Sequence, residues 1–485
     1  MHHQRGYEYH YFSFLFQKIT GFNIEQIQSV SYVITPKEGA LAAPLTVTYG
    51  QEKISNDYQP NNEQATVSLP IFGLYQNYDN QVQLTVTFTD ASQWLQTLTL
   101  TTNEFIESDY SSPIYNNITI NQLANADNKP SFSYFFLKNK LYSPIVFDID
   151  GNIRWLLPEA STNDGAAFFD GQQFITGDTQ DNAIYLQQLD GSQEKVMVTG
   201  AAYSEGVFHH NLEAGKIGML AELDVTVNDI IKKEAYLAEV LPDGSIVKEW
   251  DLGEIFSDYM ISYGDDPSNF VRYHEADNNG DGIDEVVDWF HMNTAMYDAS
   301  DDSIIISSRE NFVVKLDYQS GEIKWLLGDE TKYWYQNYPS LRALAPSLTT
   351  GIAPIGAHAL SIANDGSLML FNNGYHSLHQ PSGESAGIDR DYSTASKYRI
   401  SDDYQSYQEI WHFNEDKLSD ICSSIYQHSG GDYLMYYAST EQRTLARVVV
   451  LTEDKEILVD FQFPTQGCTS GWNAQIIELD QLIYH

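Results

Sequence analysis

The sequence is poor in cysteine, in basic side chains and in long apolar runs. Its two cysteines, Cys422 and Cys468, lie far apart and have no CxxC spacing. This arrangement argues against a metal site or a thioredoxin-like motif built on them. Two buried thiols and a single disulfide both stay open as alternatives.

Apolar runs are short throughout the chain. None approaches the roughly 18 residues that a membrane-spanning helix requires, so no membrane span is predicted. The first residues, MHHQRGYEYHYFSFLFQK, are aromatic but contain no apolar core followed by a small-residue cleavage site, as a signal peptide would. The alternatives are a cytoplasmic protein or one whose targeting segment is missing from this sequence.

Basic residues are far outnumbered by acidic ones. The chain has 26 Lys and Arg against 67 Asp and Glu, which gives a formal net charge of -41. Phosphate backbones and anionic membrane surfaces bind clustered Lys and Arg, so the composition excludes nucleic acid as an expected partner. The simplest interpretation of the charge is solubility. An anionic substrate would need a few cationic groups gathered into one locally positive site.

The residues that are abundant favour β structure. Tyr, Phe, Thr, Val and Ile are frequent, whereas long stretches with a 3.6-residue apolar period are scarce. At 485 residues the chain is too long for one ordinary core, so two domains or a repeat architecture are expected. Short alternating strands separated by polar turns predict a β-sandwich over residues 1–105. Residues 106–140 are polar and contain proline, which is typical of a linker leading into a second domain.

From about residue 141 to residue 485 a hairpin unit repeats. Each unit has two strands joined by a turn of Asp or Gly type, and several carry Trp at a similar distance after the turn. Blades of a β-propeller need about 40 residues each, so uneven spacing fits blades interrupted by long loops. The alternative is a set of unrelated hairpins in a large sandwich. The repeat favours an all-β chain with a six-bladed propeller, and the six units are FDIDGNIRWLL (147–157), LQQLDGSQEKVMV (186–198), EVLPDGSIVKEWDL (239–252), KLDYQSGEIKWLL (315–327), YRISDDYQSYQEIWHF (398–413) and VVVLTEDKEILVDFQF (448–463).

Three segments that precede hairpins contain histidine: VFHHNLE (207–213), WFHMNTA (289–295) and GAHALSI (356–362). The inner strands of a propeller converge on one axis, so these imidazoles are expected to meet there. Imidazoles suit a transition metal, but no accompanying carboxylate-rich or HxH pattern supports one. Arg309, after the strand-like run IIISS, is better explained as a bidentate clamp for an anion. His291 and Arg309 together therefore suggest transfer of an anionic group.

These motifs carry a family resemblance. DWFHMNTAMYDASDDSIIISSRENFVVKLDYQSGEIKWLLGD (288–329) resembles the corresponding stretch of bacterial arylsulfate sulfotransferases, which move a sulfuryl group between phenols without a nucleotide sulfate donor. SPIVFDIDGNIRWLL, FHHNLE, AHALSIANDGSLMLFNNG and YSTASKYRISDDYQSYQEIWHF match further family motifs in the same order. The resemblance covers nearly the whole chain and implies a six-bladed propeller with an N-terminal β-sandwich.

The resemblance also implies roles for individual residues. His358 matches the nucleophile that becomes a transient sulfohistidine in a ping-pong reaction, with an aryl sulfate as donor and a phenol as acceptor. His291 and Arg309 match groups that bind the sulfuryl oxygens. One member of the pair His209 and His210 matches a group that assists proton transfer, and strand alternation predicts that only one of them faces the site. No cofactor is implied for catalysis.

The chain departs from the family at three places. Ala359 stands where Thr usually follows the nucleophile, and Glu310 stands where His usually follows Arg309. Both departures concern substrate preference and rate more than the type of reaction. The cysteines differ from the short-loop pair of well-known members, so a bridge between Cys422 and Cys468 is only weakly implied. The resemblance implies a periplasmic or secreted location, and it leaves a homodimer open.

One motif is independent of the resemblance. The stretch DNNGDGIDEVVD (277–288) fits a twelve-residue calcium loop, with Gly282 at its sixth position and Asp in place of the usual Glu at the twelfth. The alternative is an acidic surface loop with a glycine turn. The calcium interpretation predicts a structural ion held by Asp277, Asn279, Asp281, Ile283 and Asp288.

Two classes of function follow from the sequence. The first is an aryl sulfotransferase that works through a sulfohistidine. The second is a propeller without catalysis that binds sulfated or other anionic ligands. Turnover of an aryl sulfate distinguishes them.

Overall fold

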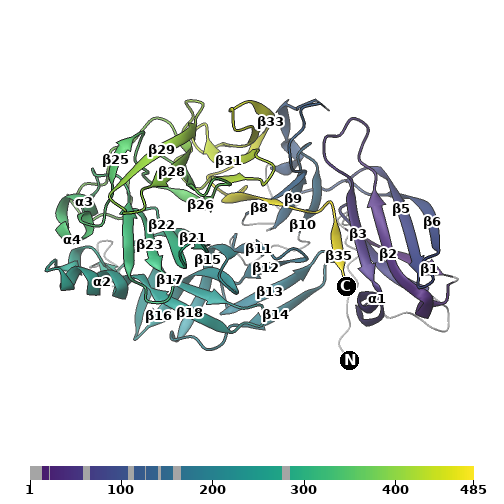
Figure 1. Cartoon of the computed structure of the whole chain (residues 1–485), viewed down its shortest axis with the longest axis horizontal. Helices are drawn as coiled ribbons and strands as arrows, with labels where there is room; N and C mark the ends of the chain where they lie inside the picture. The colour runs from purple at the N-terminus through teal and green to yellow at the C-terminus, as the bar shows by residue number, and fades with distance from the viewer. Residues whose placement is uncertain are drawn as a thin grey trace.

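The computed structural model describes residues 14–20, 22–57, 66–107, 114–125, 127–139, 144–156, 165–275 and 285–485. Strands dominate these residues, and the longest helix is α2 (Leu252–Ser262), which begins at an Asp251 cap (Figure 1). The all-β prediction is confirmed. No helix in the described ranges is long and apolar enough to cross a membrane. The remaining short elements are η1 (Ile24–Gln26), α1 (Gln51–Asp57), η2 (Tyr115–Asn117), η3 (Pro267–Asn269), β19 (His274–Glu275), β20 (Glu285–Val286), α3 (Tyr333–Asn337) and α4 (Pro339–Arg342).

The N-terminal module is formed by two sheets that share one core. In the larger sheet, buried and more exposed residues alternate along β5 (Asp79–Phe88), so one face is apolar and packs inward. Tyr32 and Val82 from the larger sheet and Ile71 from the smaller one belong to the same buried cluster. This arrangement confirms the predicted sandwich. The smaller sheet pairs β1 (Phe14–Thr20) with β4 (Thr66–Phe72), and the larger has the order β35 (Leu482–Tyr484), β3 (Leu45–Gly50), β2 (Ile27–Ile34), β5 and β6 (Gln93–Thr101).

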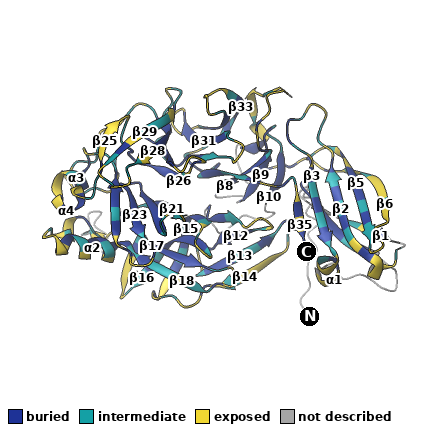
Figure 2. Cartoon of the chain, viewed as in Figure 1, coloured by how far each residue is buried: buried dark blue, intermediate teal, exposed yellow. Residues whose placement is uncertain are grey.

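Six further sheets surround a common centre (Figure 1). The first strands of successive sheets contact one another, and these inner strands are mostly buried, whereas exposed residues gather on the outer strands and helices (Figure 2). The arrangement is that of a propeller. From the centre outward the sheets are β34 (Asn473–Ile477), β8 (Tyr134–Lys138), β9 (Ile145–Asp148), β10 (Ile153–Leu156); β11 (Ala167–Phe169), β12 (Gln173–Gly177), β13 (Ala183–Gln188), β14 (Gln193–Met197); β15 (Glu205–Ala214), β16 (Met219–Val227), β17 (Ile230–Val240), β18 (Ile246–Asp251); β21 (Met292–Asp298), β22 (Ser303–Ser308), β23 (Val313–Asp317), β24 (Ile323–Leu327); β26 (His358–Ile362), β27 (Leu368–Asn372), β28 (Thr394–Ile400), β29 (Ser406–Phe413), β25 (Ser347–Thr350); and β30 (Ser424–Gln427), β31 (Tyr433–Thr440), β32 (Leu445–Leu451), β33 (Ile457–Pro464), β7 (Thr119–Gln122).

The repeated hairpins found in the sequence are the third and fourth strands of the six sheets, counted from the centre. Their turns have the local chemistry that the sequence suggested. Gly191 and Gly244 adopt φ values of 85° and 82°, which favour glycine. Asp190 and Asp243 accept backbone N–H groups two residues later, and so close the turns.

The predicted domain boundaries need correction. The range 106–140 is not merely a linker, because it contains β7 and β8, which pair with β33 and β34 near the other end of the chain. These pairings close the ring between the two ends of the propeller sequence. At the far end, β35 leaves the propeller and pairs in parallel with β3 of the sandwich. Short strands whose partners lie more than 300 residues away carry no local signal that would reveal the pairing.

Candidate functional site

The three histidine-bearing segments lie on inner strands of adjacent sheets, as predicted. His209 and His210 are on β15, His291 immediately precedes β21, and His358 begins β26. The strand β21 contacts both β15 and β26. Arg309 follows β22, and its backbone N–H bonds to the carbonyl oxygen of His291 at 3.0 Å. The propeller therefore gathers all five predicted residues into one region.

The imidazoles of His209 and His210 both lie near one buried carboxylate, although only His210 lines the cavity described below. His210 adopts a left-handed φ of 45°, and the register of β15 against β16 shifts between Phe208 and Leu212. This break suspends the alternation of a regular strand. The two Nε2 atoms therefore reach the same carboxylate, with His209 at 3.4 Å from Oε1 and His210 at 3.2 Å from Oε2 of Glu234.

Glu234 is a site residue that the sequence reasoning missed. It lies on β17, is only 2% exposed and has a left-handed φ of 47°. Its Oε2 also lies 3.1 Å from Nδ1 of His291. Burial raises the pKa of Glu234 well above its usual range, while the His209 ring opposes that rise. A glutamate within the strand sequence IIKKEAYLAEV, where buried residues predominate, was the signal available.

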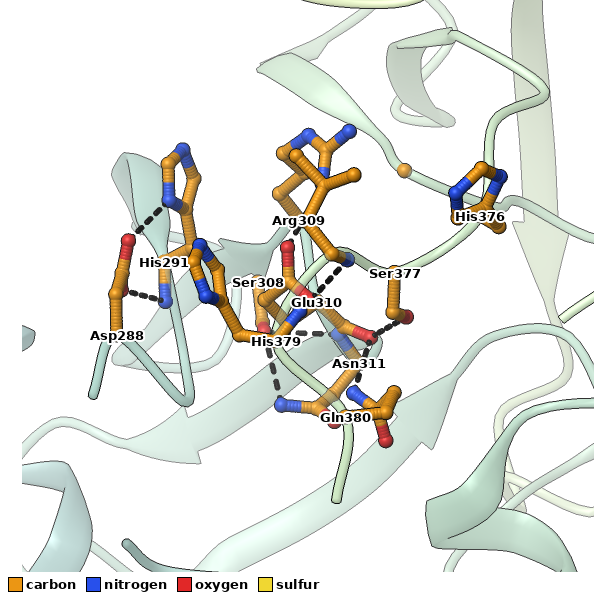
Figure 3. Close-up of polar contacts among 12 residues, drawn as sticks. Asp288, His291, Ser308, Arg309, Glu310, Asn311, His376, Ser377, His379 and Gln380 are labelled. Atoms are coloured by element: carbon orange, nitrogen blue, oxygen red, sulfur yellow. Dashed lines mark hydrogen bonds and ion pairs between the residues drawn. The ribbon is translucent and has the colours of Figure 1, made fainter. Parts of the chain in front are cut away.

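His291 is oriented by Asp288. The backbone N–H of His291 donates to Oδ1 of Asp288 at 2.9 Å, and its ring Nδ1 contacts Oδ2 (Figure 3). The carboxylate holds the ring proton on Nδ1, so Nε2 carries the lone pair and faces Nε2 of His210 at 3.4 Å. Burial and, next, the Arg309 charge lower the pKa of His291 well below its usual value.

The structure bears on one member of the proposed calcium loop. In the described residues both oxygens of Asp288 contact His291. Asp277, Asn279, Asp281 and Ile283 lie outside the residues that the structure describes. The calcium interpretation, with Asp288 at the twelfth position, therefore stays a prediction.

Arg309 is buried and held by its neighbour. Its Nη1 donates to Oε1 of Glu310 at 2.7 Å, and Oε2 of Glu310 accepts the backbone N–H groups of Leu378 and His379 at 2.7 and 2.8 Å (Figure 3). Nη2 of Arg309 has no hydrogen-bond partner among the described residues. Glu310 thus fixes the guanidinium and leaves one end of it available to an anion.

Next to the backbone of Arg309 lies a second buried basic side chain, Lys332. Nζ of Lys332 donates to the carbonyl oxygens of Arg309 and Glu310 at 3.1 and 2.8 Å. Burial lowers the pKa of Lys332 to about 7, although Glu310 opposes that fall. Lys332 therefore supports the backbone that presents the Arg309 side chain.

His358 is neutral and has a defined tautomer. Its Nδ1 lies 2.8 Å from Oδ1 of Asn373 and 3.1 Å from the carbonyl oxygen of Gly356, so this nitrogen carries the proton. Its Nε2 accepts the backbone N–H of Cys422 at 3.2 Å. Burial, followed by the nearby Arg309 charge, lowers the pKa of His358 to about 3. Cys422 is bridged to Cys468, which confirms the weakly implied disulfide.

One cavity joins part of this set. His210 and His358 both line it, whereas His291 and Arg309 are not among its walls. Trp472 also lines the cavity, with its ring centroid 4.8 Å from that of His210. The sequence reasoning did not single out Trp472, Asn293 or Ser423, because their neighbours in space come from different sheets. The full lining is His210, Asn211, Asn293, Thr294, His358, Ala359, Ser423, Trp472 and Asn473.

Comparison with known proteins assigns this arrangement to a family. Residues 96–473 match the family described as Arylsulfotransferase (ASST). The chain belongs to the arylsulfotransferase family. Residues 19–103 of this arylsulfotransferase-family chain also match the family's Ig-like domain, in agreement with the N-terminal sandwich.

Curated relatives of this arylsulfotransferase-family chain include two bacterial proteins. One is arylsulfate sulfotransferase AssT of Escherichia coli O6:H1, 28% identical over 39% of this chain and 36% of that protein. The other is AssT of Lelliottia amnigena, 28% identical over 30% of this chain and 26% of that protein. The aligned stretch thus spans about a third of each relative or less.

Similar solved structures are remote in sequence. They include a europium-containing methanol dehydrogenase, with 9% identity and a TM-score of 0.33 over 80% of this chain and 75% of that one. BamB from Moraxella catarrhalis has 12% identity and a TM-score of 0.28 over 81% of this chain and 96% of that one. At these scores the fold assignment depends on the sheet order described above.

Proposed function

We propose that this protein is an aryl sulfotransferase that moves a sulfuryl group from an aryl sulfate to a phenol through a sulfohistidine at His358. One observation carries the proposal. A neutral imidazole, with its Nδ1 proton bound by Asn373, lines the same cavity as His210 and lies near the Arg309 charge. Membership of the family supports the same activity.

Binding of the donor is assigned to the cationic side of the site. A sulfate monoester carries its charge on the sulfuryl oxygens, and a guanidinium suits such a group better than a point charge. The free Nη2 of Arg309 is the donor available for those oxygens. Trp472 offers an aromatic face for the phenyl ring beside His210.

In the first half-reaction, Nε2 of His358 attacks sulfur and the bond from sulfur to the phenolic oxygen breaks. The bonding electrons leave with that oxygen, which takes a proton from an imidazolium of the His209 and His210 pair. Nε2 must release the N–H of Cys422 to attack, and this N–H is then free to donate to a sulfuryl oxygen. Charge spreads over those oxygens in the transition state, and fixed donors stabilise it there.

In the second half-reaction, the acceptor phenol gives its proton to the now neutral imidazole and its oxygen attacks sulfur. The bond between sulfur and Nε2 of His358 breaks, which restores the starting imidazole. His291 is kept neutral by burial, so it serves as a hydrogen-bonding group rather than a second cation. No step requires a metal or an organic cofactor.

Two further expectations accompany this proposal. The buried disulfide between Cys422 and Cys468 supports a periplasmic or secreted location, because disulfides persist in oxidising compartments. A structural calcium ion held by the loop of residues 277–288 is retained as a proposal from the sequence pattern.

The test uses a chromogenic aryl sulfate with and without a phenol acceptor. With acceptor, we expect release of the coloured phenol and formation of the new aryl sulfate. Without acceptor, we expect one equivalent of colour and a mass increase of one sulfuryl group on a peptide containing His358. His358→Ala should lose both signals, whereas the exposed His412→Ala, which pairs with Glu409 on an outer strand, should keep them. Tight binding of the donor without turnover would favour the rival function, a propeller that only binds anionic ligands.

A further inference from the structure

Glu234 is the point at which three imidazoles meet. One oxygen faces His209 and the other faces both His210 and His291, at distances between 3.1 and 3.4 Å. The side chain is 2% exposed, so the carboxylate has almost no water to stabilise its charge. A buried carboxylate with this set of neighbours is stabilised when at least one of the imidazoles is protonated.

The backbone is strained where the cluster is held together. His210, Glu234 and His291 all adopt left-handed φ values, of 45°, 47° and 50°. Side chains other than glycine adopt this conformation at a cost in free energy, and such strain concentrates at functional sites. Asp224 helps to keep Glu234 in place, because its Oδ1 accepts the backbone N–H of Glu234 at 2.8 Å.

A metal ion and a shared proton are the two chemistries open to such a cluster. The backbone N–H and the ring Nδ1 of His291 each contact one oxygen of Asp288, as in a hydrogen-bonded pair. Moreover, His291 presents Nδ1 to Glu234 and Nε2 to His210, so one ion cannot take both contacts. For the set that includes His291, the geometry favours a shared proton over an ion.

We propose that Glu234 is a positioning residue that keeps a proton on the His209 and His210 pair for the departing phenoxide. This inference rests on the sulfuryl transfer proposed above. His210 is the donor, because it lines the cavity with His358, while His209 is 20% exposed and completes the carboxylate's contacts. The proton passes from Nε2 of His210 to the phenolic oxygen as the bond from sulfur to that oxygen breaks, and it returns from the acceptor phenol.

Other charged groups surround this carboxylate. Lys233 Nζ lies 3.9 Å from Oε1 of Glu234, and Asp288 and Asp224 add negative charge nearby. Arg309 is near enough to His291 for its charge to lower the pKa of that imidazole. Protonation of His291 is therefore disfavoured, whereas His209 and His210 have the Glu234 carboxylate as their neighbour.

The experiment measures kcat/KM for a series of aryl sulfates whose phenols become steadily more basic. Proton donation matters most for basic leaving groups, so the wild-type protein should show a shallow dependence on phenol pKa. Glu234→Gln should make that dependence steep. A loss of about 100-fold is expected for phenyl sulfate, against only a few-fold loss for nitrophenyl sulfate. His358 should still acquire the sulfuryl group from nitrophenyl sulfate in the variant.

A matched control lies on the same strand. Glu239 is buried at the other end of β17, where Oε1 accepts the backbone N–H groups of Ile217 and Gly218. Glu239→Gln should leave the leaving-group dependence unchanged. If Glu234→Gln does not fold, Glu234→Asp and the slope of the wild-type protein itself provide the readout.

Three results would overturn the inference. They are an equal loss across the whole series in Glu234→Gln, a steep dependence already present in the wild-type protein, and a stoichiometric transition metal in the purified protein that Glu234→Gln removes. If the wild-type protein turned over none of the aryl sulfates, that result would instead contradict the proposed function. The two failures are therefore distinguishable.

Discussion

The backbone N–H of Cys422 donates a hydrogen bond to Nε2 of His358 at 3.2 Å. The same cysteine is bridged to Cys468, which lies 46 residues further along the chain. Asn373 links the two sides of this contact, because its Oδ1 faces Nδ1 of His358 and its Nδ2 donates to the carbonyl oxygen of Cys422 at 3.0 Å. The disulfide therefore anchors the segment that orients the imidazole.

Removal of the bridge should affect stability and transfer together. Cys468→Ser is expected to lower the free energy of unfolding by about 2–4 kcal/mol, because the unfolded chain regains the entropy of an open loop. Transfer should fall as well, since Cys422 loses its anchor beside His358. Urea unfolding and steady-state rates measure both effects. A reducing agent should reproduce them in the parent protein and add nothing in Cys468→Ser; full activity of the reduced protein would contradict this role.

Arg309→Lys should impair transfer although it keeps the positive charge. A lysine has no planar fork, so it cannot bind Glu310 and a sulfuryl oxygen at once. Loss of one fixed donor at a developing charge costs about 100-fold to 1000-fold in rate, and we expect kcat/KM to fall by that order. Arg443→Lys is the control, because Arg443 is exposed and pairs with Asp420. Equal rates for Arg309→Lys and the parent protein would rule out Arg309 as the anion clamp.

Stability should depend on pH through His358. Its pKa is lowered to about 3 in the folded protein, so between pH 3 and the usual value of 6.5 the unfolded chain binds more protons. The contribution of His358 to the free energy of unfolding is therefore complete above pH 6.5. It is lost as the pH falls toward 3, by about 1.4 kcal/mol per pH unit. His291 acts in the same direction, while buried acids with raised pKa such as Glu222 act in the opposite one.

The variant His358→Gln isolates this effect. It should lose less stability than the parent protein between pH 7 and pH 5, as measured by urea unfolding at each pH. Identical pH dependence in the two proteins would show that His358 is not held neutral by burial. Transfer itself should not follow the titration of His358 above pH 5, because the imidazole is already neutral there.

Calcium should stabilise the protein if the loop of residues 277–288 binds it as the sequence predicts. Addition of calcium should raise the Tm and a chelator should lower it, because an ion that binds only the folded state stabilises that state. Asp281→Ala should abolish the difference between the two conditions. The control is Glu322→Ala, which removes an acidic side chain from an outer turn. If the Tm of the parent protein does not change when calcium is added or removed, the predicted calcium site is excluded.

Much of the fold is readable from local sequence. Turn residues such as Asp190 and Gly191 act within a few positions, so the six outer hairpins and the all-β class are predictable from the amino-acid sequence alone. The pairings that close the ring are not, because β8 and β34 lie at opposite ends of the propeller sequence and no local signal links them. For this reason residues 106–140 resemble a linker in the sequence, although they contribute two strands to the propeller.

The candidate site divides in the same way. Sequence by itself determined the propeller, the convergence of three histidine-bearing strands and the five residues His209, His210, His291, Arg309 and His358. Only the tertiary structure decided that both His209 and His210 turn toward one carboxylate, that Glu234 supplies it, and that Glu310 clamps Arg309. The physical reason is that local backbone and turn preferences act over a few residues. A left-handed backbone at His210 and a buried charge at Glu234 are instead stabilised by contacts between strands, within one sheet for His210 and Asp224 and across two sheets for His291.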